Sequence, residues 1–199
     1  MTASRIDPAA AGSVLEAAGG VAAERYGAPA VLFHWVIAVL ILAALPLGLY
    51  MVDLPLSPSK LKYYSWHKWI GVTVFVLALA RLAWRAGHRP PAPLPGQPRW
   101  QLAVAHATHV VLYLLMIAIP LTGWLFSSAA GVPTVYLGLV QLPDLVSRDA
   151  QLKEIFRLTH VALTYTLGVL TVLHVAAAIK HAVVDRDGTL TRMALGPRR

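Results

Sequence analysis

The side chains with the clearest capacity for chemistry are eight histidines, in a chain of 199 residues that contains no cysteine. The lack of cysteine excludes disulfides, iron–sulfur clusters and thiolate ligation of a metal. Imidazole chemistry is therefore the first question that the sequence raises. The histidines occupy positions 34, 67, 88, 106, 109, 160, 174 and 181.

The spacing of two of these histidines is informative. His160 and His174 are 14 residues apart, which is nearly four whole turns of an α-helix, so both rings project from one face about 21 Å apart along the axis. His34 and His67 belong to two other apolar segments, at depths that match His174 and His160 respectively. The sequence therefore predicts two pairs, His34 with His174 and His67 with His160.

A neutral imidazole is a good axial ligand for haem iron, and facing helices of a bundle are a common place for such a site. Ligation by two histidines leaves no open position on the iron, which favours electron transfer over oxygen chemistry. Gly71, one turn after His67, and the alanines at 176–178 would leave room for a flat macrocycle. The alternatives are hydrogen-bonded packing histidines and a di-metal centre. Against the di-metal centre are the lack of acidic residues within the apolar segments and the wide separation of the two pairs.

The elements that must position these rings are membrane-spanning helices. Hydrophobic residues make up 57% of the chain and charged residues 13%, with a mean hydropathy of +0.62, which is far more apolar than soluble proteins. Segments long enough to cross a bilayer are predicted at about 29–52, 66–87, 101–126 and 157–181. Short connections make neighbouring helices antiparallel. We expect an all-α integral membrane protein, a four-transmembrane-helix up-down bundle.

The charged residues predict the orientation of this bundle. The formal charge is +8, which in a lipid-embedded chain is explained by the excess of Lys and Arg in cytoplasmic loops rather than by nucleic acid binding. If both termini are cytoplasmic, eleven of the 17 basic residues face the cytoplasm and six face outward. Residues 1–25 are interpreted as a flexible leader before a domain at 26–195, and a short amphipathic piece is expected within 131–152.

Several segments resemble the bacterial cytochrome b561 family, which is related to the cytochrome b subunits of formate dehydrogenase and nickel–iron hydrogenase. They are RYGAPAVLFHW at 25–35, WHKWIG at 66–71, RLAWRAGHRPP at 81–91, AHATH at 105–109, and LH at 173–174 with DRDGTLTRM at 185–193. The resemblance covers roughly residues 25–195. It implies a multi-pass cytochrome of the bacterial inner membrane with two haem b groups, His34 and His174 holding the cytoplasmic-side haem and His67 and His160 the outer one.

Five further residues are weaker candidates for cofactor binding. His106 and His109 share a face where the third helix begins, and similar positions in the family lie near a haem edge, which suggests contact with a propionate. Arg81 could pair with a propionate through bidentate hydrogen bonds, and Trp35 could pack on a macrocycle. His181 could line a pocket for a bound ubiquinone at the inner surface. Membrane anchoring or ordinary contact with water explains these residues equally well.

Three functions remain open at this point. The first is electron transfer between the quinone pool and an outer-surface donor or acceptor, including superoxide oxidation coupled to ubiquinone reduction as in some members of the family. Basic residues expected on the outer side could steer an anion such as superoxide: Lys60, Lys62, Lys68 and Lys153. The second is a cytochrome b anchor subunit that connects a dehydrogenase or hydrogenase to quinone. The third is a non-redox metal or proton transporter, which would be colourless.

Overall fold

Four long helices form a bundle in the computed structural model of the protein, which describes residues 25–194. They are α2 (Ala28–Val52), α3 (Pro58–Gly87), α4 (Arg99–Ala129) and α5 (Ala150–Lys180). Each is long and apolar enough to cross a membrane. The predicted all-α membrane bundle is confirmed. The predicted leader lies outside the described residues except for Arg25.

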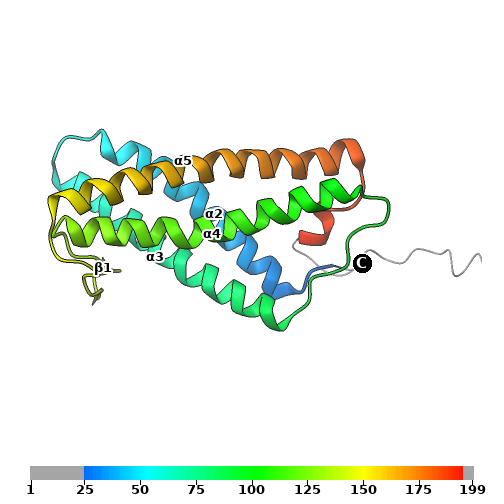
Figure 1. The fold of residues 1–199 in the computed structure, drawn as a ribbon, viewed down its shortest axis with the longest axis horizontal. Helices are drawn as coiled ribbons and strands as arrows, with labels where there is room; N and C mark the ends of the chain where they lie inside the picture. The colour runs from blue at the N-terminus through cyan, green and yellow to red at the C-terminus, as the bar shows by residue number, and fades with distance from the viewer. Residues whose placement is uncertain (1–24, 195–199) are drawn as a thin grey trace, which may run out of the picture.

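The helices alternate in direction, so that both ends of the described chain lie at one end of the bundle (Figure 1). The Tyr26 N–H donates to the Arg192 carbonyl at 3.2 Å, and the Arg25 guanidinium donates to the Ala194 carbonyl at 2.7 Å. We call this end, where residues 25 and 194 lie, the terminal end. The opposite end carries a small β-hairpin between α4 and α5, and we call it the hairpin end.

Two helices begin earlier than the hydropathy of the sequence indicated. α3 begins at Pro58 rather than near residue 66, because the Ser57 hydroxyl accepts from the Lys60 N–H at 3.2 Å and proline suits the first turn of a helix. α5 begins at Ala150 rather than near residue 157, where the Asp149 carboxylate caps the helix. Hydropathy marks where a helix enters lipid, and these two helices continue beyond that level.

In the segment 131–152, where a short amphipathic piece was expected, the chain forms an antiparallel hairpin of β1 (Val135–Tyr136) and β2 (Val140–Gln141). Its turn places Leu137 and Gly138 at φ values of 53° and 73°. The hairpin is attached to α3, since the Trp69 indole N–H donates to the Val135 carbonyl at 2.7 Å.

The apolar core lies among α2, α3 and α4, where Ile37, Val74, Ala78 and Met116 form a buried cluster. α5 packs most closely on α4 and makes little direct backbone contact with α2 or α3. Leu167 is the one residue within α5 whose side chain is buried. The paired histidines lie between α5 and these two helices, α2 and α3.

Candidate functional site

One pair of histidines joins α2 to α5 at the terminal end of the bundle. His34 lies near the start of α2 and His174 near the end of α5, and their ring centres are 6.2 Å apart with the planes at 66°. These two helices share little other packing. The two imidazoles are thus the polar groups that α2 and α5 present to each other at this level.

A second pair joins α3 to α5 at the hairpin end. The ring centres of His67 and His160 are also 6.2 Å apart, and the planes lie at 81°. Both histidines of α5 therefore face a partner from another helix. The two levels are separated by about 21 Å of helical rise.

The distance between ring centres, 6.2 Å within each pair, can be compared with the distance expected for two imidazoles that bind one metal ion. An imidazole nitrogen binds a transition-metal ion at about 2 Å. Because the centre of each ring lies about 1 Å behind its nitrogen, two imidazoles on opposite sides of one ion have centres roughly 6 Å apart. Both pairs have this separation.

His160 is held in the tautomer that ligation through Nε2 requires. Its Nδ1 lies 2.9 Å from the Ile119 carbonyl oxygen, and because a carbonyl can only accept, Nδ1 carries the proton. The lone pair is then on Nε2. Metal-binding histidines commonly donate their second ring N–H to a backbone carbonyl in this way. The Thr122 hydroxyl, 3.4 Å from Nδ1, lies on the same side of the ring.

Glycines on the neighbouring helices make room for both rings at the hairpin end. A Cβ at Gly48 of α2 would lie 3.0 Å from Cε1 of His67, and one at Gly123 of α4 would lie 3.1 Å from Cε1 of His160. These approaches are closer than a side chain tolerates without displacing the ring. Nδ1 of His67 is buried and has no hydrogen bond of standard geometry among the described residues, with the Ala44 backbone next to this ring.

At the terminal end, Arg81 of α3 points at the pair. Its Nη1 lies 3.3 Å from Nδ1 of His34, and because a guanidinium can only donate, Nδ1 accepts in this arrangement. Metal ligation by His34 through Nε2 therefore requires that Arg81 stop donating to Nδ1. An anionic group beside the pair, such as a propionate, would attract the guanidinium away from the ring.

Two glycines on the helices that carry the histidines border open space. A Cβ added at Gly71, one turn from His67, or at Gly168, between the two histidines of α5, would meet no atom within 4 Å. The predicted room next to His67 is thus present. Together with the spacing of the rings and the tautomer of His160, this space fits a haem held by each pair.

The weaker candidates from the sequence fall into different places. The His109 ring centre is 5.4 Å from that of His174, so His109 is next to the terminal-end pair, and His106 lies one turn away on the same face of α4. Trp35 contacts the edge of His34 at 5.3 Å. Its indole N–H donates to the Met193 carbonyl at 2.8 Å, so this residue also holds the C-terminal segment against α2.

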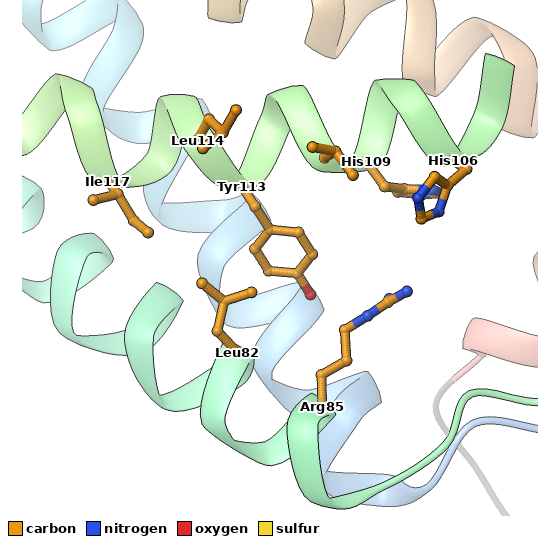
Figure 2. Close-up of a pocket in the computed structure, with 8 residues that line it drawn as sticks. Leu82, Arg85, His106, His109, Tyr113, Leu114 and Ile117 are labelled. Atoms are coloured by element: carbon orange, nitrogen blue, oxygen red, sulfur yellow. The ribbon is translucent and has the colours of Figure 1, made fainter. Parts of the chain in front are cut away.

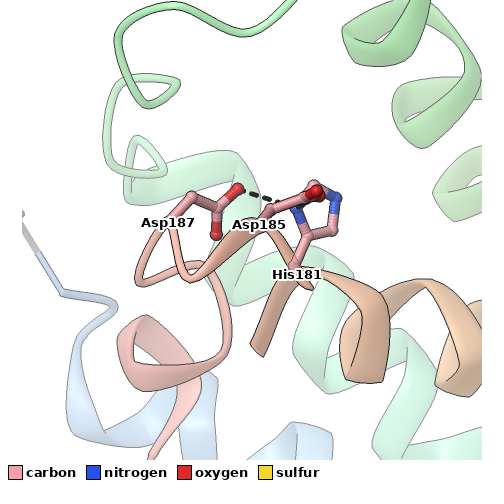
Figure 3. Close-up of side chains that lie close together, drawn as sticks. All are labelled: His181, Asp185 and Asp187. Atoms are coloured by element: carbon pink, nitrogen blue, oxygen red, sulfur yellow. Dashed lines mark hydrogen bonds and ion pairs between the residues drawn. The ribbon is translucent and has the colours of Figure 1, made fainter. Parts of the chain in front are cut away.

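His181 belongs to a polar cluster just beyond α5, in a turn of π-helix (His181–Asp185) (Figure 3). Its Nδ1 lies 2.7 Å from Asp187 and 3.1 Å from Asp185, and Gln101 approaches its Nε2 at 3.3 Å. Burial alone would raise the pKa of Asp187, but hydrogen bonds from Thr189 and His181 outweigh it and lower the pKa to about 2. This cluster ties the end of α5 to the C-terminal segment.

Two cavities open at the terminal end. One, of about 270 Å³, lies between α3 and α4 and is lined by both His106 and His109 (Figure 2). The other, of about 230 Å³, lies between the start of α2, the end of α3 and the linker, and Arg25, Arg81, Arg85 and Arg89 all contribute to it. His181 lines neither of these cavities.

The model of the prokaryotic cytochrome b561 family matches residues 25–196 of the chain. The chain belongs to this family. Cytochrome b561 homolog 2 of Escherichia coli (strain K12) is 34% identical over 171 residues, covering 85% of this chain and 91% of that protein. Cytochrome b561 homolog 1 of the same organism is 29% identical, covering 72% and 80% respectively. The probable superoxide oxidase CybB of Yersinia pestis is 26% identical, covering 85% and 96%.

Membership in the cytochrome b561 family makes the chain a bacterial membrane cytochrome that binds haem b. The resemblance inferred from the sequence segments is confirmed. Sequence reasoning missed the roles of Gly48 and Gly123. A glycine close after a proline within an apolar helix, as with Pro46 and Gly48 or Pro120 and Gly123, is the signal that could have located the two ring contacts.

Proposed function

We propose that this cytochrome b561 carries two haem b groups, one between His34 and His174 and one between His67 and His160, and transfers electrons between an outer-surface donor and the quinone pool. The observation that carries the proposal is the equal 6.2 Å separation of the two ring pairs at opposite ends of the bundle. Each haem would supply a one-electron couple stabilised by two imidazole ligands.

The terminal end is proposed to face the cytoplasm of a bacterial inner membrane. Within the described residues, eight Lys and Arg side chains belong to this end and six to the hairpin end, which agrees with the excess of basic residues in cytoplasmic loops. The hairpin end, with His67 and His160, then faces outward. This orientation makes the His67–His160 pair the entry point for electrons from an outer donor.

Superoxide is the proposed donor. The name of the Yersinia pestis relative, a probable superoxide oxidase, indicates this chemistry, and the hairpin end carries lysines that would attract a small anion. Lys68, next to His67, donates to the Val132 and Pro133 carbonyls at 3.4 and 3.3 Å. Lys60 donates to the Val52 and Leu54 carbonyls and so caps α2. These hydrogen bonds hold both lysines in place at the hairpin end.

The overall reaction balances with two donors for each quinone. Two superoxide anions lose one electron each and leave as O₂, while one ubiquinone gains two electrons and two protons and leaves as ubiquinol. Charge is conserved because the two protons offset the two negative charges. Protons taken from the cytoplasmic side would make the reaction electrogenic.

The experiment that tests this proposal is an anaerobic assay of the purified protein in detergent with superoxide and a short-chain ubiquinone. We expect the b-type absorption bands to appear with superoxide, and one ubiquinol to form for every two superoxide anions consumed. A protein that binds haem but is not reduced by superoxide would favour the anchor-subunit alternative, which needs a partner enzyme. A colourless protein would contradict both and favour the transporter.

A further inference from the structure

We infer that the arginine-lined cavity at the terminal end binds the phosphate headgroup of an anionic phospholipid. The cavity lies between the start of α2, the end of α3 and the linker that follows α3, and its volume is about 230 Å³. This volume is below the range of about 300–1,000 Å³ that encloses a drug-sized ligand, so it suits a headgroup whose acyl chains lie in the bilayer. The inference goes beyond the proposed electron transfer and does not depend on superoxide as the donor.

Four guanidinium groups from three parts of the chain line this cavity. Arg25 precedes α2, Arg81 and Arg85 belong to the last two turns of α3, and Arg89 belongs to the linker. The described residues that line the cavity include no Asp or Glu. Guanidinium groups bind phosphate oxygens through paired, charge-assisted hydrogen bonds. Basic pockets between membrane helices are a known form of site for anionic lipid headgroups, and this lining has that form.

Two of these arginines have no ionic partner within the described chain. Neither Arg85 nor Arg89 forms an ion pair with another described residue, and both are exposed. At the hairpin end, by contrast, Lys68 donates to two backbone carbonyls and Arg157 pairs with Glu154. The donors of Arg85 and Arg89 are therefore available to a ligand.

Arg81 and the outer arginines of the cavity lie at different depths. Arg81 is level with His34, since its Nη1 is 3.3 Å from Nδ1 of that ring. Arg85 is four residues farther along α3, which is about 6 Å of helical rise toward the terminal surface, and Arg89 follows after the helix ends. Arg81 is therefore placed for a haem propionate, whereas the outer arginines lie nearer the level of the lipid phosphates.

Aromatic and apolar side chains beside the cavity suit a membrane interface. Tyr26 and Trp84 line it, and Tyr and Trp are enriched at the depth of the lipid headgroups. Val76, Ala80 and Ala83 recur at helical spacing and are all exposed on one face of α3, and Ala83 immediately precedes Trp84. An acyl chain can lie along this face while the phosphate reaches the arginines. Free inorganic phosphate would use the arginines alone, so we assign the cavity to a lipid.

The first test is native mass spectrometry of the haem-loaded protein titrated with phosphatidylglycerol and, separately, with phosphatidylcholine of the same acyl chains. We expect one tightly retained phosphatidylglycerol per chain and weaker binding of phosphatidylcholine, whose headgroup has no net charge. Equal affinity for the two lipids would overturn the inference. Displacement of phosphatidylglycerol by millimolar inorganic phosphate would also overturn it, because the cavity would then be a site for the free anion.

Substitution of the outer arginines separates a lipid site from general surface charge. Arg85→Gln and Arg89→Gln should each weaken phosphatidylglycerol binding about fivefold, the effect of one basic residue on an anionic headgroup, with the haem content unchanged. Arg99→Gln removes one charge at the same end but outside the cavity lining, and it should leave the affinity unchanged. Equal weakening by all three variants would show attraction by net charge alone and would refute the site.

Photolabelling locates the bound lipid. Phosphatidylglycerol with a photoreactive group in its headgroup should label residues within 25–30 or 84–91, and this labelling should be lost in the double variant Arg85→Gln, Arg89→Gln. A label confined to the hairpin end would overturn the inference. Loss of haem in either single variant, or a fall in the midpoint potential of the terminal-end haem as large as in Arg81→Gln, would assign these arginines to the propionate and would also overturn it.

Discussion

His160 and His174 project from the same face of α5, and each meets a histidine from a different helix at a ring-centre distance of 6.2 Å. α5 thus supplies one histidine to each site, and α2 and α3 each supply the partner histidine of one site. Because α5 makes little other contact with these two helices, the cofactors themselves would join α5 to them. Haem binding and assembly of the bundle are therefore expected to be coupled.

The two glycines behind the hairpin-end rings should be sensitive to substitution. In Gly48→Ala or Gly123→Ala the new methyl group would approach His67 or His160 to about 3.0–3.1 Å, so the ring must move by a few tenths of an ångström. We expect a shifted midpoint potential or partial loss of the hairpin-end haem, measured by redox titration and haem content. Gly87→Ala, whose Cβ meets no atom within 4 Å, is the control, and an equal effect there would contradict the argument.

Arg81 should control the potential of the terminal-end haem. A cation near a haem stabilises the reduced form, so Arg81→Gln should lower the midpoint potential. One charge within about 10 Å at an effective dielectric constant of about 20 is worth roughly 1.5 kcal/mol, or about 60 mV for a one-electron couple. Arg81→Lys should retain most of the wild-type value. A potentiometric titration in which the midpoint potential of the hairpin-end haem shifted instead would contradict the assignment of Arg81 to the terminal-end haem.

The lysines of the hairpin end should accelerate the reaction with superoxide. Lys62→Gln combined with Lys153→Gln removes two positive charges without altering the carbonyl contacts of Lys60 and Lys68, so the second-order rate constant should fall several-fold at low salt and converge with the wild type at high salt. Stopped-flow reduction by superoxide measures this rate constant. Arg99→Gln, at the terminal end, should not change it, and a salt-independent rate constant would argue against steering.

Protonation of Asp187 at low pH should destabilise the terminal end. Hydrogen bonds lower its pKa from an ordinary 3.8 to about 2 in the folded chain, so this carboxylate contributes stability that is complete above about pH 4 and is lost as the pH falls toward 2. Hydrogen exchange of the amide of Thr189, which donates to Asp187 at 2.9 Å, should increase over that interval. In Asp187→Asn this exchange should already be fast at pH 6. Asp144→Asn, at the hairpin end, should leave it unchanged.

The sequence predicted the spans and the matched levels of the histidines because both depend on local patterns. Charges interrupt the apolar segments, and the 14-residue spacing places His160 and His174 on one face of any regular helix. The hairpin at 135–141 could not be predicted in the same way, because its turn uses Leu137 and Gly138 rather than the Asn-Gly or Asp-Gly pairs that mark such turns.

The supporting residues of the site depend on packing between helices, which no local pattern specifies. Gly48 and Gly123 matter because particular rings lie against them, and Tyr113 and Leu82 line a cavity because α3 and α4 leave space between them. For His181, the position after α5 suggested a quinone pocket, and the structure adds two kinds of neighbour that no local pattern specifies, the carboxylates and Gln101.

The haem content per chain tests the central claim most directly. Pyridine haemochrome assays of the purified protein, with protein determined by amino-acid analysis, should give two haem b per chain in the wild type and in His88→Ala, which alters a linker histidine stacked on Trp84. His67→Ala and His34→Ala should each retain one. A wild-type content of one haem or none, or two haems retained in His67→Ala or His34→Ala, would contradict the assignment of the two pairs.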